Sequence, residues 1–216
     1  MPALEPSPRP VRCFVGLPLP EGVQEALARV IHRLAGSLAS RISWTRPGNA
    51  HVTLKFLGNV DEARLPALVD ALRGVDFAPF ALALGPAGSF PPPNMQAGGR
   101  TGGRTGRGRP RALWLGLARG GAQSVRLAAQ VERALLPLGF APGVRAFTPH
   151  VTLGRVKDVK NAQDAQAGDD WGEVERACAR ESWPAAEVSR FVLWRSDLGP
   201  GGPRYSVLAE FPARSA

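Results

Sequence analysis

The tetrapeptide His-Val-Thr-Leu occurs twice in this chain, at residues 51–54 and again at residues 150–153. Each copy is typical of a β-strand, because polar and apolar side chains alternate with the two-residue period of extended backbone. In the first copy His51 and Thr53 share one face of the strand, and the apolar side chains occupy the other. The second copy repeats this division. We therefore expect two related half-chains, each presenting an imidazole and a hydroxyl.

A pseudo-twofold axis between the halves would bring His51 and His150 to the two sides of one cleft. Two histidines are sufficient for phosphodiester chemistry without a metal. A neutral imidazole accepts a proton from the nucleophile, and an imidazolium protonates the leaving oxygen. The hydroxyls of Thr53 and Thr152 are suited to bind phosphate oxygens. Two half-buried strands that share a pattern by chance are the alternative, which the matching positions of the two copies disfavour.

The other elements are expected to mix strands and helices, without the regular βαβ spacing or the glycine-rich first turn of a doubly wound fold. Strands are predicted at residues 12–17, 51–57, 80–84, 112–117, 150–155, 188–195 and 205–211. Helices are predicted at residues 20–36, 61–72 and 124–138, with a short one within 157–183. This arrangement favours an α+β fold built on antiparallel sheet.

The charge balance indicates a polyanionic partner. The 216 residues include 27 Lys and Arg against 18 Asp and Glu, a formal net charge of +9. The only lysines are Lys55, Lys157 and Lys160, and the planar guanidinium of the arginines suits phosphate. The alternative explanation for the many arginines is a drift in amino-acid composition across the whole proteome.

The cysteine count and the hydropathy pattern predict a cytoplasmic protein. Cys13 and Cys178 form no disulfide framework, which favours a reducing compartment. The first residues lack a signal-peptide pattern, and prolines interrupt the charge-free run of residues 77–99, so no membrane helix is expected. No cluster of His, Cys, Asp or Glu has metal-ligand spacing. We expect no metal, no other cofactor, and a monomer.

Residues 91–110 contain six glycines, four arginines and four prolines. Such a segment has almost nothing to bury, which predicts a flexible loop within the domain. The arginines spaced by glycines resemble an RGG-type RNA-binding segment, although solvated arginines are common in loops.

Several further segments, together with the two His-Val-Thr-Leu copies, resemble the 2H phosphoesterase superfamily. Within it, the chain is most similar to the RNA 2′,3′-cyclic phosphodiesterases, formerly called 2′-5′ RNA ligases. The segments occur in a fixed order and make the resemblance specific. They are Phe-Val-Gly-Leu-Pro at 14–18, Trp-Thr-Arg-Pro at 44–47, Gly-Ser-Phe-Pro at 88–91, Arg-Ala-Leu-Trp-Leu-Gly at 111–116, Phe-Thr-Pro-His at 147–150, Leu-Trp-Arg-Ser at 193–196 and Tyr-Ser-Val-Leu at 205–208.

The resemblance implies a single two-lobed, pseudo-twofold domain over residues 11–212, with antiparallel sheets and helices packed outside a central cleft. It implies that the protein opens the 2′,3′-cyclic phosphate at an RNA 3′ end and leaves a 2′-phosphate. His51 would be the proton donor to the departing 3′ oxygen, and His150 the proton acceptor that activates water. The partner would be RNA with a cyclic phosphate end, and the protein would bind no membrane.

By the same resemblance, Thr53, Thr152 and Arg155 would bind the phosphate. Strict alternation along the strand places Arg155 on the face opposite His150, so it would need a strand end or a twist to reach the cleft. Lys55 is expected on the face of His51, where it would help to bind phosphate or stand as a solvated edge lysine. Phe56 is expected on the opposite, apolar face.

Three alternatives stay open at the level of sequence. Two belong to the same superfamily: 2′-5′ RNA ligation and hydrolysis of a small cyclic nucleotide. The third is a non-catalytic RNA-binding protein on this fold, which the paired His51 and His150 disfavour, because a pure binder needs no acid–base pair.

Overall fold

The computed structural model describes residues 10–38, 40–91, 110–159 and 169–214. Residues 92–109, which make up nearly all of the predicted Gly/Arg/Pro-rich loop at 91–110, lie outside the described residues. The loop therefore stays a prediction.

The strands of these residues pair into one nine-stranded sheet, in which every pairing is antiparallel. In chain order they are β1 (Val11–Pro18), β2 (Ser40–Trp44), β3 (His51–Val60), β4 (Phe80–Phe90), β5 (Ala112–Arg119), β6 (Val151–Val159), β7 (Ala186–Val188), β8 (Arg190–Gly199) and β9 (Gly202–Pro212). The α-helices of the described residues are α1 (Glu21–Ser37), α2 (Leu65–Arg73), α3 (Gly121–Leu135) and α5 (Gly172–Ala179). The predicted α+β class is thus confirmed.

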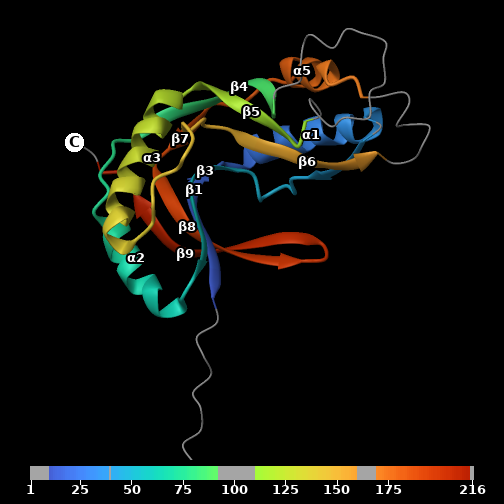
Figure 1. The fold of residues 1–216 in the computed structure, drawn as a ribbon. Helices are drawn as coiled ribbons and strands as arrows, with labels where there is room; N and C mark the ends of the chain where they lie inside the picture. The colour runs from blue at the N-terminus through green and yellow to red at the C-terminus, as the bar shows by residue number, and fades with distance from the viewer. Residues whose placement is uncertain (1–9, 39, 92–109, 160–168, 215–216) are drawn as a thin grey trace, which may run out of the picture.

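Strands from the two halves of the chain meet in the middle of the sheet. The order is β7-β4-β5-β6-β3-β1-β8-β9, and β2 pairs with β6 outside this path. The two strands that carry the repeated tetrapeptide, β3 and β6, are therefore neighbours. The sheet is curled, with α2 and α3 side by side on its outside and α1 and α5 together at the other end of the molecule (Figure 1).

The helices follow the apolar periodicity of the sequence. In α1 the buried side chains recur at the helical period, and they are Val23, Ala26, Leu27, Val30 and Leu34. Ahead of α2, the Asp61 carboxylate accepts a hydrogen bond from the backbone N–H of Ala63 at 3.0 Å, as expected for an N-cap. Glu181, which follows α5, ties that region to α1 through Arg29 at 2.9 Å and Arg33 at 2.6 Å.

Two strands, β2 and β7, were not predicted from the sequence. Strand β2 has the sequence Ser-Arg-Ile-Ser-Trp, too polar for the apolar runs that mark a buried strand, and it forms because β6 offers it a free edge. Strand β7 has only three residues and pairs with β4. Both depend on partners far away in the sequence, which a local pattern does not reveal.

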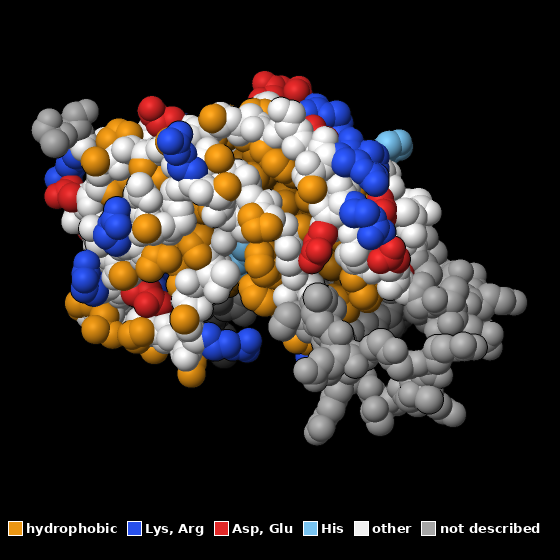
Figure 2. Space-filling view, turned by 90° about the horizontal axis from the view of Figure 1, so that it is seen from above, with side chains coloured by type: hydrophobic (Ala, Val, Ile, Leu, Met, Phe, Trp, Pro, Cys, Tyr) orange, Lys and Arg blue, Asp and Glu red, His pale blue; other side chains and the backbone are white. Residues whose placement is uncertain are grey.

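The positive charge is not gathered on the face seen in Figure 2. There, Lys and Arg side chains alternate with Asp and Glu, and hydrophobic side chains gather along a hollow in the middle. None of the helices among the described residues is long and apolar enough to span a lipid bilayer.

Candidate active site

The two His-Val-Thr-Leu segments divide their side chains between core and surface as predicted. Val52 and Leu54 of β3 are buried in the core, as are the matching Val151 and Leu153 of β6. The intervening His51, Thr53 and Thr152 are half-buried on the opposite face. His150 differs slightly from the prediction, because it stands immediately before the first residue of β6 rather than within the strand.

A single antiparallel pair, Val52 with Val151, joins the two strands. In this register Thr152 is the neighbour of His51 across the strands, and Thr53 is the neighbour of His150. The two motifs are thus related by a local twofold axis through the valine pair. This pairing brings together the four side chains that the sequence analysis selected.

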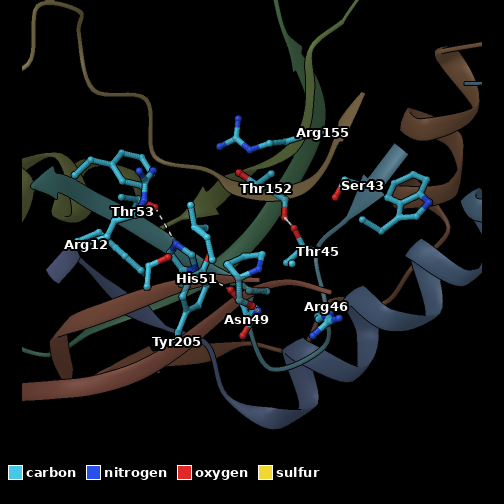
Figure 3. Close-up of a pocket in the computed structure, with 18 of the residues that line it drawn as sticks. Arg12, Ser43, Thr45, Arg46, Asn49, His51, Thr53, Thr152, Arg155 and Tyr205 are labelled. Atoms are coloured by element: carbon cyan, nitrogen blue, oxygen red, sulfur yellow. Dashed lines mark hydrogen bonds between the residues drawn. The ribbon is translucent and has the colours of Figure 1, made fainter. Parts of the chain in front are cut away.

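Both imidazoles are oriented in the same way. The Nδ1 atom of each ring lies 2.7 Å from the carbonyl oxygen two residues earlier, Asn49 for His51 and Thr148 for His150. A carbonyl only accepts, so each Nδ1 carries the hydrogen and each Nε2 is left for proton transfer. In His51, Nε2 lies 2.9 Å from Oγ1 of Thr53 (Figure 3).

Aromatic rings enclose the two histidines to different extents. The ring centroid of His51 lies 4.7 Å from that of Phe14, 5.5 Å from Trp194 and 5.4 Å from Tyr205. His150 has Phe90 at 5.2 Å and Trp114 at 6.1 Å.

Burial lowers the pKa of His51 to about 4, and the charge of His150 adds to this. Burial also lowers the pKa of His150, with a further contribution from Arg155. At neutral pH both imidazoles of the free protein are therefore neutral.

A β-bulge brings Arg155 to the motif face. Between Thr152 and Gly154, strand β6 has one more residue, Leu153, than its partner β5, so alternation is broken there. Leu153 and Gly154 both face the core, and Arg155 lines the cavity beside Thr152 (Figure 3). The bulge, rather than a strand end or a twist, brings Arg155 to the side of the cavity.

The equivalent bulge in β3 reverses two predictions. Leu54 is the additional residue relative to β1, so the residues after it change faces. Lys55 is 8 % exposed and turned away from the cavity; its Nζ donates to Oε1 of Glu132 at 3.1 Å and to the Ala141 carbonyl at 2.8 Å. The prediction that Lys55 lies on the His51 face is wrong. The prediction for Phe56 is also wrong, since this ring lines the cavity.

Gly154 stands in β6 where β3 has Lys55. A Cβ atom on this glycine would lie 2.7 Å from Ile42 and 2.9 Å from Trp44 of β2, so the additional strand leaves no room for a side chain. The two halves therefore differ where β2 packs against only one of them.

A cavity of about 550 Å³ extends from these residues, between the β8–β9 hairpin and strands β2, β3 and β6. Its walls include His51, Thr53, Thr152 and Arg155 but not His150, which lies against Phe90 and Trp114. Among the described residues, the lining includes no aspartate or glutamate, and it has two further arginines, Arg12 and Arg46 (Figure 3). Such a cavity suits an anion.

Within the described ranges, no group of three or more His, Cys, Asp or Glu side chains is placed to hold a metal ion. The side chains that line the cavity offer an imidazole for proton transfer, and hydroxyls and guanidinium groups for the binding of anions.

A sequence profile described as LigT like Phosphoesterase matches residues 17–100 and 116–205. The chain belongs to the LigT-like phosphoesterase family. This confirms the 2H phosphoesterase resemblance drawn from the sequence.

Relatives in this family cover almost the whole chain. A protein of Archaeoglobus fulgidus is 33% identical over 201 residues, 93% of this chain and 99% of the relative. One of Methanothermobacter thermautotrophicus is 30% identical and spans 93% and 98% of the two chains. Both are named RNA 2′,3′-cyclic phosphodiesterase.

Solved structures share the fold of this chain. TT0787 of Thermus thermophilus superposes with a TM-score of 0.69 at 26% identity and covers 94% of this chain and 98% of its own. The apo form of E. coli LigT, at 22% identity, gives a TM-score of 0.66 and covers 96% and 99%. The predicted two-motif, antiparallel architecture is therefore that of this family.

The sequence analysis assigned no role in the cavity to several residues of its wall, namely Arg12, Arg46, Phe56 and Tyr205. Arg46 and Tyr205 lie in segments that carried the family resemblance, so a signal for them existed. Arg12 had no such signal, and alternation placed Phe56 on the wrong face, because the position of both residues depends on the β1–β3 register and its bulges.

Proposed function

We propose that the protein hydrolyses the 2′,3′-cyclic phosphate at the 3′ end of an RNA to a 2′-phosphate, by acid–base catalysis with His51 and His150 and without a metal. The main support is the Val52–Val151 pair, which brings both motifs together beside a cavity lined by arginines and, among the described residues, by no carboxylate. The activity named for the archaeal relatives supports the same choice of substrate.

In the proposed reaction, Nε2 of His150 accepts a proton from water as the water oxygen attacks phosphorus. The bond between phosphorus and O3′ breaks, and Nε2 of His51 donates its proton to O3′. One water molecule is consumed, and the products are a 3′-hydroxyl and a 2′-phosphate. A proton returns from His150 to His51 through solvent before the next cycle.

The hydroxyls and the guanidinium group act on the charge of the phosphate. Thr53 and Thr152 donate hydrogen bonds to its non-bridging oxygens, and Arg155 compensates the negative charge that develops in the transition state. Thr53 already contacts Nε2 of His51 at 2.9 Å, so a phosphate oxygen that binds Thr53 also lies near the proton donor.

Substrate binding favours the protonated form of His51 that the reaction needs, and the proton comes from solvent. The pKa of about 4 in the free protein leaves this ring neutral at pH 7. An anionic phosphate beside an imidazole favours its charged form and raises its pKa. His51 thus becomes protonated as the cyclic phosphate enters.

The product isomer tests this proposal. With a short RNA ending in a 2′,3′-cyclic phosphate and EDTA present, we expect a 2′-phosphate as the only product and a rate equal to that without EDTA. A 3′-phosphate product would contradict the assignment of O3′ as the leaving oxygen. Loss of activity in EDTA would contradict the metal-independent mechanism, and binding without turnover would indicate an RNA-binding protein.

The two lowered histidine pKa values predict an acidic optimum. The productive free enzyme carries one proton on the histidine pair, and this form is lost as pH rises through the higher pKa, which lies below 6.5. It is lost again as pH falls through the lower pKa, near 4. We therefore expect a bell-shaped profile of kcat/KM with its maximum below pH 6.5, measured from pH 3.5 to 9 with circular dichroism to verify folding. A maximum above pH 7 would contradict the lowered values.

A further inference from the structure

One part of the cavity wall has no role in the proposed reaction. It consists of Phe56 on β3 and Arg12 on β1, which both line the cavity. The Phe56 side chain is 62 % exposed, which is unusual for a large apolar ring in a central strand. Its ring centroid lies 6.1 Å from that of Phe14, which in turn packs against His51. A flat apolar surface is thus available next to the histidine.

Arg12 lies farther from the histidines along the same face. On β1, the residues Gly16, Phe14 and Arg12 follow one another at the two-residue period of a strand and so share one face, and Phe14 and Arg12 both line the cavity. Gly16 pairs with Thr53, Phe14 with Phe56, and Arg12 with Asn59. Two residues of extended strand span about 7 Å. Arg12 therefore branches from the strand one such step beyond the Phe14–Phe56 pair, whereas Arg155 stands beside Thr152.

The Arg12 guanidinium is not neutralised by an acid. Within the part of the chain that the structure describes, Arg12 has no ion pair with a carboxylate, and the lining of the cavity includes no Asp or Glu. It also faces the same space as Arg155. Burial raises the pKa of Tyr205, and the charges of Arg155 and Arg12 both oppose that shift, so both cations lie near this hydroxyl. Besides Arg155 on β6, the cavity wall thus offers Arg12 on β1 as a cation for an anion.

We propose that Arg12 binds the phosphate on the 5′ oxygen of the terminal nucleotide, while the base of that nucleotide stacks on Phe56. This inference rests on the proposed function, in which the cyclic phosphate lies at the two histidines. An RNA that ends in a cyclic phosphate continues only through the 5′ oxygen of its last nucleotide. The next negative charge is therefore one nucleotide away, and a cation and a stacking surface lie in that direction along β1 and β3.

The arrangement selects a class of substrate. A nucleoside 2′,3′-cyclic phosphate leaves Arg12 without a partner, whereas an RNA end, or a mononucleotide with an additional 5′-phosphate, pairs with it. A hydrogen-bonded charge pair of this kind contributes about 10-fold or more to kcat/KM. The protein therefore prefers RNA ends to small cyclic nucleotides.

Three substrates test the inference: adenosine 2′,3′-cyclic phosphate, the same molecule with a 5′-phosphate, and the dinucleotide ApA with a 2′,3′-cyclic end. For the wild type, we expect kcat/KM to be about 10-fold or more higher for the second and third than for the first. Arg12→Ala should reduce both ratios to near one. The matched control is Arg126→Ala on the exposed surface of α3, which removes the same charge and should leave the ratios unchanged.

The stacking part is tested with Phe56. Phe56→Ala should lower kcat/KM for all three substrates by a similar factor of about 5, whereas Phe56→Tyr, which keeps the ring, should retain the wild-type values. Leu136→Ala is the control, since Leu136 is a large exposed apolar side chain away from the cavity, 52 % exposed. A Phe56→Ala variant with wild-type values for all substrates would refute the stacking role.

Binding of products separates this inference from the proposed function. Wild-type affinity for adenosine 2′,5′-bisphosphate should exceed that for adenosine 2′-phosphate about 10-fold, and Arg12→Ala should remove the difference. If none of the three substrates is cleaved, the proposed function is wrong, and this binding ratio still decides whether Arg12 is a second phosphate site. Equal wild-type affinities, or a difference that survives in Arg12→Ala, would overturn the inference.

Discussion

Replacement of either His51 or His150 by alanine is expected to lower kcat for cyclic phosphate hydrolysis by at least about 100-fold, because each removes one partner of the proton transfer. The double variant should be little worse than either single variant, since neither histidine completes the reaction without the other. The measurement is single-turnover cleavage of a short RNA with a 2′,3′-cyclic end at the pH optimum of the wild type.

The chain contains its own control for this experiment. His32 is the only other histidine in the sequence. It is exposed on α1, so His32→Ala should retain full activity. The thermal midpoint of each variant shows whether a loss of activity reflects unfolding. Retention of more than about a tenth of the wild-type kcat by a folded His51→Ala or His150→Ala protein would contradict the acid–base pair.

The sequence was sufficient to find the two motifs because their pattern is local. Alternation in residues 51–54 and 150–153 divides core from surface without knowledge of any partner, and Val52 and Val151 are fully buried as it requires. The repetition of the pattern then led to a twofold relation, which the β3–β6 pair realises. The face on which the histidines and threonines lie was therefore predictable from the sequence alone.

The residues after each motif were not predictable in the same way. A β-bulge is a property of a strand and its neighbour, so Leu54 and Leu153 give no sign of it in the sequence. The side chains that directly follow the bulge change faces. This is why Arg155 lines the cavity against the alternation rule and why Lys55 is in the core.

The inequality of the two histidines was also beyond the sequence. The tetrapeptides are identical, yet His51 is enclosed by Trp194 and Tyr205 of the β8–β9 hairpin, which comes last in the chain. His150 has Phe90 and Trp114 instead. Different burial, from contacts distant in sequence, lowers the pKa of His51 to about 4. The site thus distinguishes the two imidazoles by their surroundings.

The buried Lys55 fixes the chain that leads to the second motif. Glu132 of α3, through Oε1, accepts hydrogen bonds from Lys55 Nζ at 3.1 Å and from the backbone N–H of Gly143 at 2.8 Å, and the Ala141 carbonyl accepts another from Lys55 at 2.8 Å. The Lys55 side chain is 7 % exposed and that of Glu132 is 30 % exposed, so the pair is mostly shielded from water. Strand β3 and the segment before His150 are therefore joined through one ion pair.

Glu132→Gln is expected to lower the free energy of unfolding by about 2 kcal/mol, because it leaves the Lys55 ammonium buried without a counter-charge. The matched control is Glu210→Gln, which breaks a pair with Arg190 in which both side chains are about half exposed, 50 % and 46 %. That change should cost less than about 0.5 kcal/mol. Urea unfolding at pH 7 measures both free energies.

The double variant Lys55→Met/Glu132→Leu removes both charges and should recover most of the loss, since buried apolar side chains replace such a pair at little cost. Equal effects of Glu132→Gln and Glu210→Gln would show that the Lys55–Glu132 pair behaves as a solvated surface contact and does not anchor the segment before His150.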